Sequence, residues 1–198
     1  MGPGAQGVGR LPLSAGRRAW SCPRQVPLPA SPGRATGKGD AVKRRARPRI
    51  LFVNGPNLNV LGKREPEVYG RMTLDGIRRE VERAARREGA AVEFYQSNHE
   101  GEIVGRLQEA RGNFDGLVIN PGGYTHSSVA IRDALIYAGV PAVELHLSNP
   151  ARREPFRRTS LVEDVVVGRI AGFGGYGYVL ALSALLNLLR EAGGLAAR

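Results

Sequence analysis

Short apolar segments alternate with amphipathic segments from about residue 49 onward. The first apolar run, residues 50–53, is closed by Asn-Gly-Pro, and a buried strand is predicted to stop there because proline lacks a backbone donor. Further strands are predicted at residues 91–96, 116–120, 141–146 and 165–170, and helical patterns begin near residues 73, 97, 127 and 178. This alternation favours an α/β fold: a flavodoxin-like, doubly wound five-stranded parallel sheet with helices on both faces.

Capping residues predict where several of these helices begin and end. Thr73 can cap the first helix, and Gly89 can end it in a left-handed conformation. The stretch Ser97-Asn-His-Glu100 has the spacing of a capping box and predicts the start of the second helix.

Four successive strands are predicted to end on polar residues: Asn54, Gln96, Asn120 and His146. In a parallel sheet the carboxyl ends of all strands meet at one edge, which is where open α/β domains bind ligands. The loops after residues 55, 120 and 146 leave from the same edge. Asparagine is also a common turn residue, so coincidence remains an alternative explanation for these endings.

The charge of +11 is unevenly distributed along the 198 residues. Residues 1–48 carry ten Lys or Arg and a single acid, whereas residues 49–198 carry nineteen Lys or Arg and seventeen acids. The first segment is also rich in glycine and proline, so we expect a disordered basic extension of 1–48 and a folded domain of 49–198. The extension is either without function or a site of weak, salt-sensitive contacts with polyanions.

The chain contains one cysteine, Cys22, which excludes an intrachain disulfide framework and places no thiol in the folded domain. No apolar run approaches the roughly 18 residues of a membrane helix. A cytoplasmic setting is expected from these two features.

Few residues are candidates for chemistry. Of the three histidines, His99 falls at a helix start and is expected to be exposed, whereas His126 and His146 belong to the loop edge of the sheet. Histidine exchanges protons near neutral pH without a metal. The long loop after the first strand adds Arg64 and Tyr69, and an arginine close to a tyrosine favours the phenolate.

Two other kinds of site are weakly supported. The two histidines with Asp133 or Glu144 would make a 2-His-1-carboxylate metal set, but no closely spaced ligand pair accompanies them. Gly172, Gly174 and Gly177 match G-x-G-x-x-G, yet no further βαβ unit follows them, so close packing of the last helix explains them better than dinucleotide binding. Proton transfer on a small anionic carbonyl or hydroxy compound is the chemistry that remains.

Five motifs, in order, resemble the type II 3-dehydroquinate dehydratases of the shikimate pathway, over residues 49–192. They are Asn54-Gly-Pro-Asn-Leu-Asn59, Arg64-Glu-Pro with Val-Tyr-Gly70, Asn120-Pro-Gly-Gly-Tyr-Thr-His126 with Ser-Val-Ala-Ile-Arg-Asp133, Glu144-Leu-His-Leu-Ser-Asn149 and Phe156-Arg-Arg-Thr-Ser160. Three features depart from the family pattern: Thr159 where histidine is frequent, Glu163-Asp164 where small residues are common, and the N-terminal extension.

The resemblance implies a trans elimination of water from 3-dehydroquinate to 3-dehydroshikimate, without metal or coenzyme, in aromatic amino acid biosynthesis. Tyr69 would be the base, Arg64 would lower its pKa, and His146 would be the acid that protonates the departing hydroxyl of the enolate. The other roles implied are Asn57 for a water that stabilises the enolate, Asn120, His126, Asp133 and Arg157 for the substrate hydroxyls, and Leu147 and Ser148 for its carboxylate.

The resemblance also implies an assembly of trimers stacked into a homododecamer. A second hypothesis is a non-enzymatic module in which the sheet edge holds an anion and the basic extension holds nucleic acid. It predicts nucleic-acid retention that depends on residues 1–48 and survives loss of Tyr69.

Overall fold

The computed structural model describes residues 47–62 and 72–193, and their centre is a five-stranded parallel sheet. The strand order is β2-β1-β3-β4-β5, so the chain winds outward from β1 in both directions. The strands are β1 (Arg49–Asn54), β2 (Ala91–Gln96), β3 (Gly116–Asn120), β4 (Ala142–His146) and β5 (Gly168–Ala171). The predicted doubly wound parallel sheet is confirmed.

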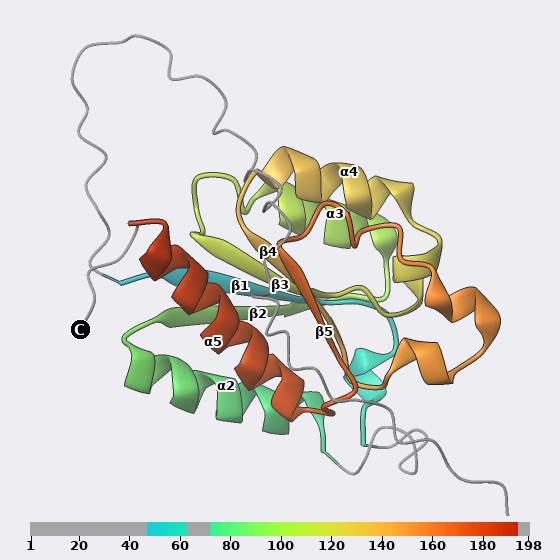
Figure 1. The fold of residues 1–198 in the computed structure, drawn as a ribbon, viewed down its shortest axis with the longest axis horizontal. Helices are drawn as coiled ribbons and strands as arrows, with labels where there is room; N and C mark the ends of the chain where they lie inside the picture. The colour runs from blue at the N-terminus through green and yellow to red at the C-terminus, as the bar shows by residue number, and fades with distance from the viewer. Residues whose placement is uncertain (1–46, 63–71, 194–198) are drawn as a thin grey trace, which may run out of the picture.

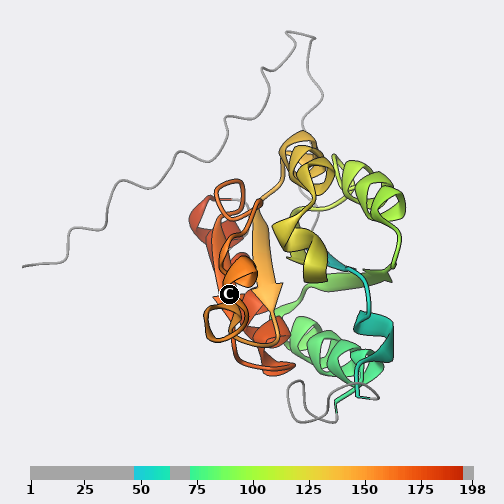
Figure 2. The same cartoon turned by 90° about the vertical axis from the view of Figure 1, so that its right-hand side faces the viewer.

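Two helices cover each face of the sheet (Figure 1). The helices are α2 (Leu74–Glu88), α3 (Glu100–Gln108), α4 (Val129–Ala138) and α5 (Tyr176–Glu191). Figure 2, turned by a quarter, shows α3 and α4 together on one side of the sheet and α2 with α5 on the other. Short 3₁₀ turns lie in the loops: Leu58–Val60, Gly122–His126, Pro150–Arg152 and Pro155–Arg158.

Alternate residues of β1 belong to separate cores, which is why the apolar run is continuous. Ile50 and Phe52 pack in the core that α2 and α5 cover, whereas Leu51 and Val53 pack in the core under α3 and α4. Successive side chains of a strand point to opposite faces, so a strand that is covered on both faces needs apolar residues at every position.

The first helix begins and ends as the sequence predicts. The Thr73 hydroxyl accepts a hydrogen bond of 3.1 Å from the Gly76 amide, and Gly89 ends α2 at a φ of 68°. The predicted capping box at α3 is wrong, because His99 is the N-cap and makes no side-chain cap. Ser97 is buried, and its hydroxyl instead donates to Glu102 at 2.5 Å.

The fifth strand begins at Gly168 rather than at Val165 as predicted. Val165 donates its amide to the Val162 carbonyl and closes a turn, and pairing with β4 runs only from Gly168 opposite Val143. Because β4 itself starts at Ala142, the valines before Gly168 have little strand to pair with. Val165 and Val166 still contact the core under α3 and α4, so their apolar character reflects packing rather than strand structure, whereas Val167 is exposed.

The division of the chain into an extension (residues 1–48) and a domain (residues 49–198) stays a prediction. Most of the basic extension lies outside the described residues, but its last residue, Pro48, is buried and its carbonyl accepts a hydrogen bond from Ala91. Among the described residues, no helix is long and apolar enough to cross a bilayer.

Candidate active site

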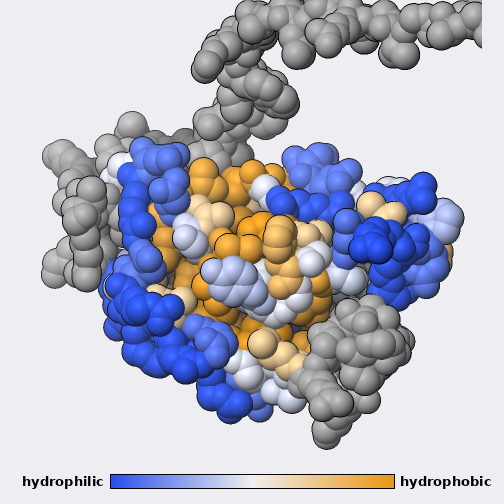
Figure 3. All heavy atoms as spheres, turned by 60° about the horizontal axis from the view of Figure 1, so that its bottom comes forward, coloured by the Kyte–Doolittle hydropathy of each residue, from blue (hydrophilic) through white to orange (hydrophobic). Residues whose placement is uncertain are grey.

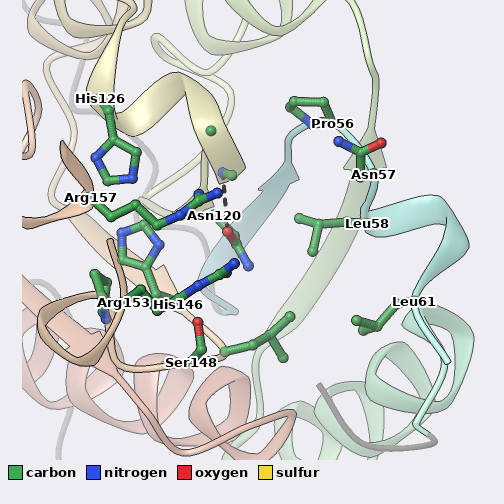
Figure 4. Close-up of a pocket in the computed structure, with 14 residues that line it drawn as sticks. Pro56, Asn57, Leu58, Leu61, Asn120, His126, His146, Ser148, Arg153 and Arg157 are labelled. Carbon is green, nitrogen blue, oxygen red and sulfur yellow. Dashed lines mark hydrogen bonds between the residues drawn. The ribbon is translucent and has the colours of Figure 1, made fainter. Parts of the chain in front are cut away.

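A pocket of about 210 Å³ lies at the carboxyl edge of the sheet, between the loops that follow β1, β3 and β4 (Figure 4). Seven residues that the sequence singles out line it: Asn57, Asn120, His126, His146, Leu147, Ser148 and Arg157. Asp133 is not among the lining residues and is exposed on α4. Arg64 and Tyr69 lie outside the described residues.

Close backbone contact brings the first two loops together. A Cβ at Gly55 would lie 2.3 Å from the Pro121 carbonyl oxygen, so only glycine fits where these loops meet. The next residues turn sharply: Asn57 adopts a left-handed φ of 67°, and its amide donates to the Asn98 side chain at 2.9 Å. This places Asn57 at the mouth of the pocket, opposite the histidines (Figure 4).

A buried tyrosine fixes Asn120 in the floor of the pocket. The Tyr178 hydroxyl donates to the Asn54 side chain at 2.7 Å and accepts from the Asn120 amide nitrogen at 3.1 Å. Burial raises the pKa of Tyr178 well above its ordinary value, which keeps the hydroxyl protonated. Asn54 is therefore a structural residue rather than a group at the ligand edge. No sequence pattern singles out Tyr178 within its apolar helix.

His146 is held by a carboxylate two residues earlier on the same strand. Its Nε2 lies 2.7 Å from an oxygen of Glu144, and both residues are buried. Because a carboxylate only accepts hydrogen bonds, Nε2 carries the proton in this pair, and Nδ1 is the nitrogen that gains or releases a proton. Residues i and i+2 of a strand share a face, so the motif Glu-Leu-His contained this pairing as a readable signal.

Glu144 is fully buried and its carboxylate is richly hydrogen-bonded. Ser160 donates to its two oxygens at 2.9 and 3.1 Å, Thr125 donates at 3.3 Å, and the Arg169 guanidinium lies 3.5 Å away. Burial alone would raise the pKa of Glu144, but His146, Arg169 and Ser160 together lower it below its usual value of 4.5. The residue is therefore an anion at neutral pH, and its negative charge lies against the His146 ring.

This pairing predicts how stability depends on pH. Since the pKa of Glu144 is depressed by folding, its contribution is fully present above pH 4.5 and is lost as the pH falls through the lower folded value. Glu144→Gln should cost about 3 kcal/mol in unfolding free energy near neutral pH, the scale for removing one partner of a buried ion pair. This loss of unfolding free energy should become smaller as the pH is lowered. Urea unfolding followed by circular dichroism measures it.

The exposed Glu93 supplies the control. It pairs with Arg49 and Arg106 at the surface, so Glu93→Gln should change stability little at any pH. A Glu144→Gln deficit that stays constant down to pH 3 would contradict the assignment.

His126 is oriented by a backbone carbonyl from the loop after β4. Its Nδ1 lies 2.6 Å from the Thr159 carbonyl oxygen, and its ring meets Phe156 edge to face at 6.4 Å. The carbonyl requires a proton on Nδ1, which leaves Nε2 of the neutral ring as an acceptor. Thr159 acts through its backbone, so this contact does not depend on which side chain stands at the position.

Two arginines give the pocket a positive wall. Arg153 and Arg157 both line it, and both contact Glu154, at 3.5 and 2.7 Å. Arg153 was missed in the sequence, although its place in the basic loop after β4 was a usable signal. Such a wall suits a small anion, because guanidinium groups bind carboxylates through paired donors.

The glycine-rich segment before α5 serves packing. A Cβ at Gly177 would lie 3.0 Å from the Leu145 side chain, and one at Gly175 would lie 2.4 Å from the Met72 sulfur. Gly177 therefore lets α5 lie close to β4, and Gly175 leaves room for the Met72 side chain, whereas Gly172 and Gly174 adopt positive φ values of 92° and 55°. In the part of the chain that the structure describes, no group of three or more His, Cys, Asp or Glu is arranged to hold a metal.

Comparisons of this chain with known proteins, by family model, by sequence and by structure, agree with one another. The model of the family described as dehydroquinase class II matches residues 48–186. The 3-dehydroquinate dehydratase of Thermotoga neapolitana is 54% identical over 144 residues, which span 73% of this chain and 98% of that protein. A catabolic 3-dehydroquinase of Aspergillus clavatus is 53% identical over 142 residues, which span 72% of this chain and 95% of that protein.

Solved structures agree with the sequence matches. The type II dehydroquinase of Butyrivibrio crossotus superposes with a TM-score of 0.70 at 44% identity, and the match covers 72% of this chain and 99% of that one. The type II dehydroquinase of Propionibacterium acnes gives a TM-score of 0.69 at 42% identity over 71% and 97% of the two chains.

Proposed function

The chain belongs to the dehydroquinase class II family, and on that premise we propose that it dehydrates 3-dehydroquinate to 3-dehydroshikimate in the shikimate pathway. The observation that carries the proposal is the buried His146 and Glu144 pair at a pocket with an arginine wall. The pair supplies a proton donor, and the wall supplies charge for a substrate carboxylate. This combination suits the loss of water from a hydroxylated keto acid.

His146 acts as the acid in the proposed reaction. The Glu144 carboxylate favours the imidazolium and fixes the ring through Nε2, so Nδ1 delivers its proton to the departing hydroxyl. A protonated leaving group departs as water, whereas hydroxide is a poor leaving group. The buried Glu144 carboxylate thus both stabilises the protonated form of His146 and orients its ring.

Tyr69 acts as the base that removes the proton next to the ketone, and Arg64 stabilises its phenolate. Removal of that proton gives an enolate, which then expels the hydroxyl that His146 protonates. The base comes from the segment after β1 and the acid from the end of β4, and such separate origins suit attack on opposite faces of the ring, as trans elimination requires. A water positioned by Asn57 stabilises the enolate oxygen.

The remaining pocket residues hold the substrate. Asn120, His126 and Arg157 bind its hydroxyls, and Leu147 with Ser148 binds its carboxylate. Asn120 and His126 are pre-oriented for this by Tyr178 and the Thr159 carbonyl, which lowers the entropy cost of binding. The same role for Asp133 has no support from this chain's own pocket, because the residue lies exposed on α4.

We also propose that residues 49–198 are the catalytic domain of a cytoplasmic homododecamer of stacked trimers. The face in Figure 3 carries apolar side chains over its middle, bordered by hydrophilic ones. Phe173 and Tyr176, just before and at the start of α5, are 61% and 62% exposed. Large aromatic side chains left exposed on a single subunit support contact between subunits.

A direct assay tests the proposed function. Purified protein given 3-dehydroquinate should form a conjugated enone that absorbs in the near ultraviolet, at a rate unchanged by EDTA or by borohydride. EDTA would remove a required metal, and borohydride would trap a Schiff base. Absence of the enone would refute the proposed reaction, and sensitivity to either reagent would refute the cofactor-free mechanism.

A further inference from the structure

Arg169, on the edge strand β5, places a positive charge beside the carboxylate that holds His146. It stands opposite Glu144 in the strand pairing, and its Nε lies 3.5 Å from a Glu144 oxygen. Its side chain is 25% exposed, and its buried Nε and Nη2 make no hydrogen bond within the described residues. Its charge therefore acts on Glu144 through a poorly solvated space, where electrostatic interactions are strong.

Glu163, at the surface, competes with Glu144 for the Arg169 guanidinium. Arg169 Nη1 donates to a Glu163 oxygen at 3.2 Å, and the Glu163 side chain is 52% exposed. A series of contacts thus runs from the pocket outward through His146, Glu144, Arg169 and Glu163, and its last three members alternate in charge. Glu163 and Asp164 are also the pair that departs from the family pattern in the sequence.

We propose that Arg169 is a positioning residue for the acid, which withholds part of the Glu144 charge from His146 and so makes the imidazolium a stronger proton donor. Glu163 moderates this effect by drawing the guanidinium outward. The catalytic meaning of the network rests on the proposed dehydration, but the charge coupling itself concerns only His146 and its neighbours.

Within the described part of the chain, the other charged and polar groups around His146 do not contact Arg169. Among the described residues, His126, Arg153 and Arg157 share the pocket with it, and they approach from the loops after β3 and β4. Ser160 and Thr125 contact Glu144 as neutral donors. None of these contacts involves Arg169, so a change at Arg169 isolates the proposed coupling.

The expected signs follow from the charges. In Arg169→Met, Glu144 keeps its full negative charge for His146, so the imidazolium should titrate about half to one pH unit higher than in the parent protein. In Glu163→Gln, Arg169 loses its outer partner and its charge acts more strongly on Glu144. His146 should therefore titrate at a lower pH than in the parent protein, by less than the shift in Arg169→Met. The basic limb of the kcat profile should move in the same directions, because the acid must be protonated to act.

The experiment is an NMR titration of histidine-labelled full-length protein without substrate, with the His146 signal assigned by its loss in His146→Asn. Asp164→Asn is the matched control: it makes the same charge change next to Glu163, but Asp164 pairs with Arg132 rather than with Arg169. It should leave the His146 titration unchanged. If Arg169→Met does not fold, the surface variants Glu163→Gln and Asp164→Asn decide the matter between them.

Two results would overturn the inference: an unchanged His146 titration in a folded Arg169→Met, or equal shifts in Glu163→Gln and Asp164→Asn. Because the titration needs no turnover, these results are distinct from failure of the proposed function. A protein that shows the shifts but forms no enone refutes the dehydratase and leaves the charge network standing.

Discussion

Replacing His146 with asparagine is expected to lower kcat by about a thousandfold, within the range that a positioned general acid contributes. Asparagine keeps a polar group in the pocket but cannot release a proton to the departing hydroxyl. KM should change little, since the lost interaction belongs to the transition state rather than to the bound substrate. Steady-state kinetics with 3-dehydroquinate measures both constants.

The same variant tests whether proton removal precedes loss of water. If an enolate forms first, His146→Asn should still exchange the substrate's α proton with deuterated solvent, at a rate that exceeds its dehydration rate. Exchange can be followed by NMR on the recovered substrate. The control is His99→Asn, because His99 is exposed at the start of α3 and makes no side-chain cap. A His146→Asn variant with more than a tenth of the parent kcat would remove His146 from its role.

The layered fold could be predicted because its signal is local. Residues 50–53 are apolar without interruption, as burial on both faces demands, while α2 shows one buried stripe that includes Ile77 and Val81. The capping box at α3 failed through a local contact between Ser97 and Glu102, whereas the start of β5 was decided by a contact distant in sequence. Val165 reads as strand in isolation, yet the start of β4 at Ala142 determines where pairing with β5 begins.

The site was predictable to the extent that strand ends define it. Asn120 and His146 end neighbouring strands and line the pocket, whereas Asn54 ends the strand between β2 and β3 and bonds inward to Tyr178. The position of a residue at a strand end does not say which way its side chain turns. That direction depends here on a hydroxyl from α5, 124 residues away along the chain.

Glu144 illustrates a different limit on what can be predicted from the sequence. A glutamate within an apolar strand is costly unless it is paired, so its presence alone indicated a buried partner. His146 was the visible candidate by strand periodicity. Ser160, Thr125 and Arg169 come from other loops and strands, and no local pattern connects them with Glu144.

Replacing Tyr69 with phenylalanine is expected to lower kcat by at least a thousandfold while substrate binding persists, because the change removes only the phenolic oxygen that acts as the base in the proposed reaction. Tyrosine ordinarily has a pKa of about 10, and each unit by which a neighbour lowers it corresponds to about 1.4 kcal/mol of stabilisation of the phenolate. Arg64→Met should therefore raise the pH at which activity appears, whereas Arg64→Lys should preserve more of it.

Deuterium exchange separates the base from the acid. Tyr69→Phe should lose exchange of the α proton together with dehydration, whereas His146→Asn should lose dehydration alone. Isothermal titration calorimetry with 3-dehydroquinate confirms that the inactive variant still binds. Tyr137→Phe makes the same chemical change at an exposed position on α4 and should leave both rates intact. If Tyr69→Phe still exchanges the α proton at the parent rate, another group is the base, and Arg64 loses its proposed role as well.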